Sequence, residues 1–145
     1  STVINNLGNP GVIAHGISVK PGKPTIVGIV NNKPIFGLPG NPVSAMVVFN
    51  LLVRPSIYFA SGCVNPPSLA IIPAILTKDV PSSSGREDHI QVKLEISKNG
   101  DLYADPLFAK SNLIHSLVKA DGTVTVPFDE GGLYSGTKVD VKCFY

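Results

Sequence analysis

Two lysines and a turn-to-helix junction carry the residue types that could bind an oxyanion. Lys20 and Lys23 lie in the stretch KPGKP, a stiff turn that would hold two positive charges together with little entropy to lose. Further on, the stretch GLPGNPVS contains Asn41, which suits a helix N-cap, and Pro42, which suits the first helical position. Unpaired N–H groups would give this helix start, with Ser44 in its first turn, positive dipole character. The two motifs predict an anion site, above all for phosphate.

Each motif also has an ordinary structural interpretation. Most strand–turn–helix junctions bind no ligand, and GLPGNPVS is neither a P-loop nor a dinucleotide-binding fingerprint. The two lysines could be solvated side chains of a surface turn, and Ser44 could serve only to cap the helix. On these residues alone both interpretations stay open.

The elements expected before the helix place the two motifs in one sheet. Residues 1–11 are polar and rich in turn formers, which predicts a frayed start or a loop, and residues 12–19 are expected to form a strand. Residues 25–30 and 34–38 are expected to form a hairpin, because the turn 31–33 carries residues that tolerate positive φ.

A helix is expected from Pro42 to about Ala60. Its residues are apolar almost all round, which predicts burial on several sides. Pro55 should kink the helix or end its first segment, because proline removes a backbone donor and clashes with the preceding turn.

The stretch 61–68 has the composition of a linker, so we expect a domain boundary between residues 62 and 63. After it the hydrophobic pattern changes from helical to alternating, most clearly over residues 89–96. A hairpin turn is expected at 98–101, a short helix at 111–119, and the other strands at 69–76, 102–107, 123–127 and 138–144. The second part, residues 63–145, is therefore predicted to be a small, mostly-β barrel or sandwich.

The composition limits the classes of partner. The 145 residues carry a formal net charge of +2 and 15% charged side chains, so no broad basic surface for nucleic acid is expected. Cys63 and Cys143 form no metal motif and no disulfide framework, which fits a reducing cytoplasm. The start shows no signal peptide, and the apolar run 43–53 is too short to span a bilayer. We expect a cytoplasmic protein with neither nucleic acid nor membrane as partner.

Two further side chains in the second half could contribute to an anion site. Arg86 offers a planar fork of donors, and Ser111 offers a hydroxyl. Arg86 could instead form a surface ion pair of little consequence with Glu87 or Asp88, and Ser111 could cap the short helix. Glu87 and Asp88 are expected to be a solvated charge pair rather than metal ligands, so no metal site is predicted.

The motifs together resemble a known enzyme family. The stretches HGISVKPGKPT, residues 15–25, and GLPGNPVSA, residues 37–45, follow each other in a way that is similar to the molybdopterin molybdotransferases. This is the MoeA family, which includes the E domain of gephyrin. The resemblance continues through residues 85–88 and the stretch 111–117 to residues 120–122, so it covers nearly the whole chain.

The resemblance implies a fold and a reaction. Members of the family insert molybdate into adenylylated molybdopterin and release AMP, with Mg²⁺. Residues 1–62 would then be the C-terminal part of the molybdopterin-binding α/β domain, and residues 63–145 the C-terminal β domain of the family. The implied fold class is an α/β fragment followed by a small, mostly-β domain.

The resemblance also implies roles for single residues. Lys20 and Lys23 match positions of the family's oxyanion site and are the catalytic candidates. Molybdate is a tetrahedral dianion, so it needs several convergent donors. The residues implied to bind substrate or oxyanion, or to shape the rigid loop beside it, are Ser44, Arg86, Ser111, Pro39, Gly40, Asn41 and Pro42.

Two departures from the family's pattern qualify the resemblance. Asn112 stands where the family usually has glycine, which affects the backbone expected for that loop. The family's Gly-Gly-x-Ser-x-Gly-x-x-Asp motif, with the acidic residues that hold Mg²⁺, does not occur in residues 1–145, and the chain opens on Ser1 rather than Met. We therefore expect a C-terminal fragment that is inactive alone, with sheet edges left open for pairing.

Three functional hypotheses remain. The first is an enzyme fragment of molybdenum cofactor synthesis, a homodimer when full length, with the molybdopterin adenylyltransferase as a further partner. The second is a non-catalytic interaction module of the gephyrin type, which the intact pair Lys20 and Lys23 disfavours, because a scaffold has no need of a cationic turn. The third is a general phosphate- or nucleotide-binding protein with no preference for molybdate.

Overall fold

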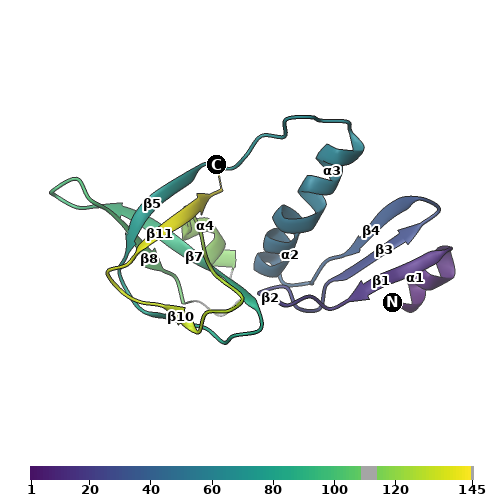
Figure 1. Ribbon diagram of the computed structural model, residues 1–145, viewed down its shortest axis with the longest axis horizontal. Helices are drawn as coiled ribbons and strands as arrows, with labels where there is room; N and C mark the ends of the chain where they lie inside the picture. Colours follow the sequence, from purple (N-terminus) through teal and green to yellow (C-terminus); the bar gives the residue numbers. More distant parts are fainter. Residues whose placement is uncertain (109–113, 145) are drawn as a thin grey trace. The chain divides into compact units, whose positions relative to one another are not determined.

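The chain forms two compact units, Ser1–Pro66 and Pro67–Tyr145, called here the first and the second unit. The structure, a computed structural model, describes residues 1–108 and 114–144 (Figure 1). The division falls between Pro66 and Pro67, whereas the sequence places the boundary between residues 62 and 63. Both positions lie in the exposed segment 61–68.

The first unit begins with a helix where the sequence predicts a loop. Helix α1 spans Thr2–Leu7, and the N–H of Asn5 donates to the carbonyl of Ser1 at 3.1 Å. The side-chain oxygen of Asn5 accepts the N–H of Val12 at 2.8 Å, which ties the helix to the adjacent strand. Ile4 lies over Gly28, since a Cβ added there would be 3.1 Å from its Cγ2 atom. These contacts stabilise a helix that its own composition disfavours.

Three antiparallel strands form the sheet of the first unit, in the order β1, β3, β4. They span Pro10–His15, Ile26–Val30 and Lys33–Gly37, and β2 is the two residues Val19–Lys20. The predicted hairpin is confirmed by β3 and β4, whose turn holds Asn31 and Asn32 at φ 50° and 63°. The predicted single strand over 12–19 is wrong, because Gly16, at φ 92°, interrupts it.

The predicted helix from Pro42 to Ala60 is present as one continuous segment. It consists of α2 (Pro42–Val48), a π-helical turn η1 (Phe49–Val53) and α3 (Arg54–Ala60). Pro55 causes the predicted interruption in the form of this wider turn, in which the N–H of Arg54 donates to the carbonyl of Phe49. Because Pro55 has no N–H to donate, an irregular turn at this point removes the clash with the preceding residues.

The prediction that this helix is buried on several sides is wrong for most of its length. Buried residues lie in α2, whereas η1 and α3, in which every residue is described, have none. Phe59 is 88% exposed. By length and composition only, the segment Pro42–Ala60 could cross a membrane, and core helices of soluble proteins meet the same two criteria. The apolar run 43–53 by itself is too short to span a bilayer. The expectation of no membrane partner stays a prediction.

The second unit is a closed barrel, which decides between the barrel and the sandwich that the sequence leaves open. Its strands are ordered β7, β8, β5, β11, β9, and β9 pairs back with β7 to close the ring. The pairing of β5 with β8 is parallel, and the other pairings in the ring are antiparallel. The strands span Ile71–Leu76 (β5), Glu87–Ile96 (β7), Leu102–Pro106 (β8), Gly122–Val126 (β9) and Lys138–Cys143 (β11).

Smaller elements cover the barrel. The two-residue strands β6 (Val80–Pro81) and β10 (Gly132–Leu133) pair in an antiparallel manner, and helix α4 spans Ile114–Lys119. Helix α4 contacts β7, and the N–H of Leu107 donates to the carbonyl of Gln91 at 2.9 Å. Leu107 and helix α4 therefore both lie beside β7.

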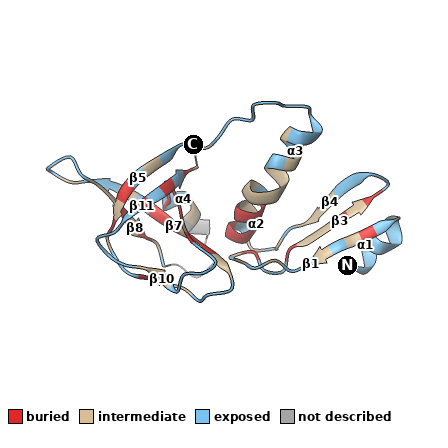
Figure 2. Cartoon of the chain, viewed as in Figure 1, coloured by how far each residue is buried: buried red, intermediate tan, exposed pale blue. Residues whose placement is uncertain are grey.

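The barrel core consists of small and medium apolar side chains (Figure 2). Strand β11 alternates as predicted, with Val139, Val141 and Cys143 buried between exposed neighbours. Strand β7 departs from its prediction, because Gln91 on the polar face is buried as well. Segments that lie far from β7 in sequence cover this face, and the local pattern holds no information about them.

Candidate functional site

The lysine turn is closed by backbone hydrogen bonds within the first unit. The N–H of Gly16 donates to the carbonyl of Thr25 at 2.8 Å, and the N–H of Ile17 donates to the carbonyl of Lys23 at 3.0 Å. The side chains of Lys20 and Lys23 are both exposed. Two long cationic side chains on a turn with fixed ends are well placed to bind a small anion.

The helix start is capped more completely than the sequence predicts. The side-chain oxygen of Asn41 accepts the N–H groups of Val43 at 3.1 Å and Ser44 at 3.5 Å, and Pro42 has no N–H. The next N–H, of Ala45, donates to the carbonyl of Asn41 at 2.8 Å. The predicted N-cap is confirmed, but the predicted set of unpaired N–H groups is not present in this first turn. An anion would have to displace the Asn41 side chain to reach them.

Ser44 and the glycines of the loop differ from their expected environments. Ser44 is buried, with 6% of its surface exposed, so its hydroxyl does not project into solvent. Gly37 packs on the sheet, because a Cβ there would lie 3.1 Å from the Cβ of Ile26. A Cβ added at Gly40 would meet nothing within 4 Å, so Gly40 is an open position of the loop, between Pro39 and Asn41 in the sequence.

The lysine turn packs against the helix that follows the second motif. Gly22, in the middle of the lysine turn, lies against helix α2, since a Cβ added to it would be 2.8 Å from the Cγ2 atom of Val48. Val48 is fully buried. The lysine turn is therefore packed on α2 at Val48, the last residue of the helix whose first turn contains Ser44.

Arg86 forms an ion pair with a buried carboxylate rather than a surface ion pair of little consequence. Its Nε–H donates to Oδ1 of Asp88 at 2.8 Å, and its Nη2 donates to Oδ2 at 3.3 Å. Asp88 is fully buried, so the expectation of a solvated charge pair is wrong. The sequence pattern that indicates burial of Asp88 is the alternation of β7, which places Asp88 on the same face as Ile90 and Val92.

Glu87 also has a specific partner. Its carboxylate lies 2.7 Å from Nε2 of His89, and Nδ1 of His89 lies 3.3 Å from the hydroxyl of Thr125. Burial lowers the pKa of His89 below its ordinary value of 6.5, with Glu87 acting in the opposite direction. Within residues 1–108 and 114–144, no group of three or more His, Cys, Asp or Glu side chains is arranged to hold a metal.

The remaining candidate residues are Ser111 and Arg86. Ser111, like Asn112, lies outside the described residues. Arg86 belongs to the second unit, whereas Lys20 and Lys23 belong to the first. The geometry therefore brings together the lysine turn and the C-terminal end of α2, at Val48.

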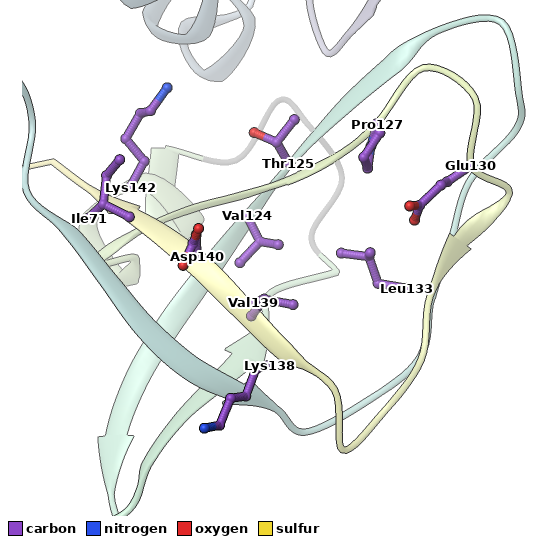
Figure 3. A pocket seen from close by; sticks show the side chains of 10 residues that line it. All are labelled: Ile71, Val124, Thr125, Pro127, Glu130, Leu133, Lys138, Val139, Asp140 and Lys142. Carbon is purple, nitrogen blue, oxygen red and sulfur yellow. The ribbon is translucent and has the colours of Figure 1, made fainter.

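The barrel carries a pocket that the sequence does not predict (Figure 3). Strands β9 and β11 pair at Thr123 with Lys142 and at Gly122 with Cys143. Next to these pairs the two strands line a pocket of about 320 Å³. Its apolar part contains Val124, Val139, Leu133, Pro127 and Ile71, and its polar part contains Thr125, Glu130, Lys138, Asp140 and Lys142.

Comparison with known proteins identifies the family. A family model described as the MoeA C-terminal region (domain IV) matches residues 73–144, and one described as a probable molybdopterin binding domain matches residues 2–58. A solved structure of the MoeA molybdopterin biosynthesis protein from Pyrococcus horikoshii superposes with a TM-score of 0.81 at 39% identity. This chain belongs to the MoeA family.

Other MoeA relatives agree with this assignment. A molybdopterin molybdenumtransferase from Haemophilus influenzae is 33% identical over 132 residues, which is 88% of this chain and 32% of that protein. The molybdenum cofactor synthesis protein cinnamon from Drosophila melanogaster is 38% identical over 77% of this chain and 18% of its own length. The Pyrococcus MoeA structure covers 99% of this chain, which in turn covers 34% of that structure. The chain thus spans about a third or less of each of these three relatives.

Proposed function

We propose that this chain contributes the oxyanion-binding part of a MoeA enzyme, which inserts molybdate into adenylylated molybdopterin and releases AMP. Names of MoeA relatives support molybdenum cofactor biosynthesis as the coarser function. The lysine turn carries the proposal, because it presents two exposed cationic side chains on a short turn with fixed ends, packed through Gly22 against Val48 of α2.

In this proposal Lys20 and Lys23 supply the charge that attracts the molybdate dianion and act as the catalytic residues. The loop of Pro39, Gly40, Asn41 and Pro42 shapes the site beside them. A shift of the Asn41 side chain would free two N–H groups for the oxyanion, because that side chain caps them in the present geometry. Ser44, Arg86 and Ser111 complete the proposed set of donors.

The proposal includes a cofactor and partners. We assign Mg²⁺ to acidic residues of the whole enzyme outside these 145 residues, where the ion would supply charge neutralisation for the pyrophosphate link of the substrate. We also propose a homodimer for the full-length enzyme, an encounter with the molybdopterin adenylyltransferase that makes its substrate, and a cytoplasmic location.

Titration of this chain with molybdate tests the oxyanion site. Molybdate binding measured by calorimetry should weaken about tenfold or more in Lys20→Ala and in Lys23→Ala, because each variant removes one charge-assisted contact. Lys33→Ala, which removes an exposed lysine from the hairpin turn of the same unit, is the control and should bind as the wild type does. Equal affinity for phosphate, AMP and molybdate would instead favour a general phosphate-binding protein.

The pocket of the barrel supports a second candidate function, a non-catalytic interaction module. Its apolar floor at Val124, Val139 and Leu133, with charged side chains around it, fits an extended peptide that has one apolar anchor. A peptide selected on the wild-type chain from a random display library should lose binding in Leu133→Asp and keep it in Lys98→Ala. Lys98 is exposed and lies outside the pocket lining. Molybdate binding without any selectable peptide would reject this function.

A further inference from the structure

We propose that Thr25 is a positioning residue, which holds the lysine turn in the geometry that binds the oxyanion. The inference rests on the proposed function of Lys20 and Lys23 and assigns a role to a side chain that takes no part in binding. Thr25 is fully buried, although threonine is a polar residue. A buried hydroxyl needs a hydrogen-bond partner, and the partner of this hydroxyl lies in the lysine turn.

Thr25 forms two hydrogen bonds to the middle of the lysine turn. The hydroxyl of Thr25 donates to the carbonyl of Gly22 at 2.6 Å, and the backbone N–H of Thr25 donates to the same carbonyl at 3.2 Å. Both lone pairs of the Gly22 carbonyl are therefore used, which fixes the orientation of the peptide group that joins Gly22 to Lys23.

The other side of the turn is fixed by packing. Gly22 has φ 137°, a conformation that L side chains rarely adopt, and the position of its missing Cβ is 2.8 Å from Val48 of helix α2. Thr25 holds the Gly22 carbonyl while Val48 limits the approach of the Gly22 backbone. Loss of the hydroxyl would let the peptide group rotate within this contact.

The orientation of this peptide group decides where Lys23 begins its side chain. Lys20 and Lys23 flank Gly22 in the sequence, and the carbonyl of Lys23 is itself held by the N–H of Ile17 at 3.0 Å. Each lysine side chain loses rotamer entropy when it binds, on the order of 2 kcal/mol. A turn backbone that is already fixed reduces the additional ordering that an anion must impose.

Three variants and a matched control separate this role from simple stabilisation. Thr25→Val keeps the shape of the buried side chain and removes the hydroxyl, whereas Thr25→Ser keeps the hydroxyl. The control is Thr137→Val, because the hydroxyl of Thr137 donates to the carbonyl three residues before it, of Tyr134, at 2.7 Å in the second unit. If Thr25→Val does not fold, Thr25→Cys, whose thiol is a weak donor, replaces it.

The measurement is a titration of the ¹⁵N-labelled chain with molybdate, followed by the amide signals of the lysine turn and by the dissociation constant. Thr25→Val should bind molybdate about tenfold more weakly, Thr25→Ser within about twofold of the wild type, and Thr137→Val as the wild type does. In the free Thr25→Val variant, the amide signals of Gly22 and Lys23 should already be shifted.

Two outcomes overturn the inference and leave the proposed function intact. One is wild-type affinity in Thr25→Val together with a lower free energy of unfolding, which would make the hydroxyl purely structural. The other is a loss of affinity in Thr25→Ser as large as in Thr25→Val. A wild-type chain that shows no response to molybdate would reject the proposed oxyanion site itself, and this inference with it.

Discussion

Burial determines what each charged residue of this chain can do. Lys20 and Lys23 are exposed, whereas Asp88 is fully buried beside Arg86. A buried carboxylate is stable only with partners that offset its lost hydration. Arg86 therefore stabilises the barrel as well as serving as a candidate donor, and a substitution there affects both properties.

Arg86→Ala should lower the free energy of unfolding by about 3 kcal/mol, because it removes two hydrogen bonds from a buried carboxylate. Urea unfolding of the variant and the wild type measures the difference. Arg86→Lys keeps the charge but not the two-pronged geometry and should lie between them. Equal stability of the alanine variant would show that the pair contributes nothing to folding.

His89 makes the stability of the barrel vary with pH in the mildly acidic range. Burial lowers the pKa of His89 in the folded chain, assisted by Lys142 and opposed by Glu87 and Asp88. At pH values near and below 6.5, the ordinary pKa of this side chain, the unfolded chain therefore binds more protons than the folded chain. The free energy of unfolding should therefore fall as the pH decreases from 7.5 to 5.5, as urea titrations at several pH values would measure. His89→Gln should reduce this slope, whereas His15→Gln, at an exposed position, should keep it. An unchanged slope in His89→Gln would contradict the assignment.

At the scale of single elements, the turns follow local sterics closely. The hairpin of β3 and β4 turns at Asn31 and Asn32, which both adopt positive φ. Asparagine tolerates this region better than other residues with a side chain, and two-residue hairpins favour it. The longer helix is irregular in its middle, as Pro55 predicts, and the irregularity takes the form of the wide turn η1.

Asn32→Val should destabilise the first unit by about 1–2 kcal/mol, because a β-branched residue is strained at φ 63°. Asn32→Gly should be neutral or stabilising, since glycine adopts positive φ without strain. Thermal and urea unfolding of both variants would measure these effects. A valine variant as stable as the glycine variant would mean that the hairpin adopts another turn.

At the scale of the whole molecule, the chain consists of two units joined by the exposed segment 61–68. The barrel has a closed ring of strands and its own apolar core. The first unit has a smaller set of buried side chains, at Thr25, at Val30 and in helix α2. This difference predicts unequal resistance to unfolding.

Limited proteolysis should therefore cut the chain first within residues 61–68 and leave a resistant fragment that contains the barrel. Mass spectrometry of the products identifies the cut, and circular dichroism of the fragment from Pro67 onward tests whether it stays folded. The hairpin turn at 98–101, which is also exposed, serves as an internal comparison because its two strands are held in the barrel ring. Earlier cutting there would contradict the two-unit description.

The sequence alone determines the features that depend on neighbouring residues. The turns at 31–32 and 98–101, the Asn41 cap, the alternation of β11 and the motifs of the MoeA family can all be predicted from short stretches. These features follow from backbone sterics and hydrogen bonds over a few residues, which a short window of sequence contains. The lysine turn and the loop at Gly40 are features of the same kind.

The tertiary structure decides what surrounds those features. Helix α1 forms because Asn5 and Ile4 contact strands that follow it, and Asn41 occupies the N–H groups that the sequence leaves free for an anion. Burial of Asp88 and His89, the contact of Gly22 with Val48 and the pocket beside β11 join residues that are distant in the sequence. Such contacts depend on how the chain closes on itself, because burial and pairing are properties of the folded arrangement rather than of a short stretch of residues.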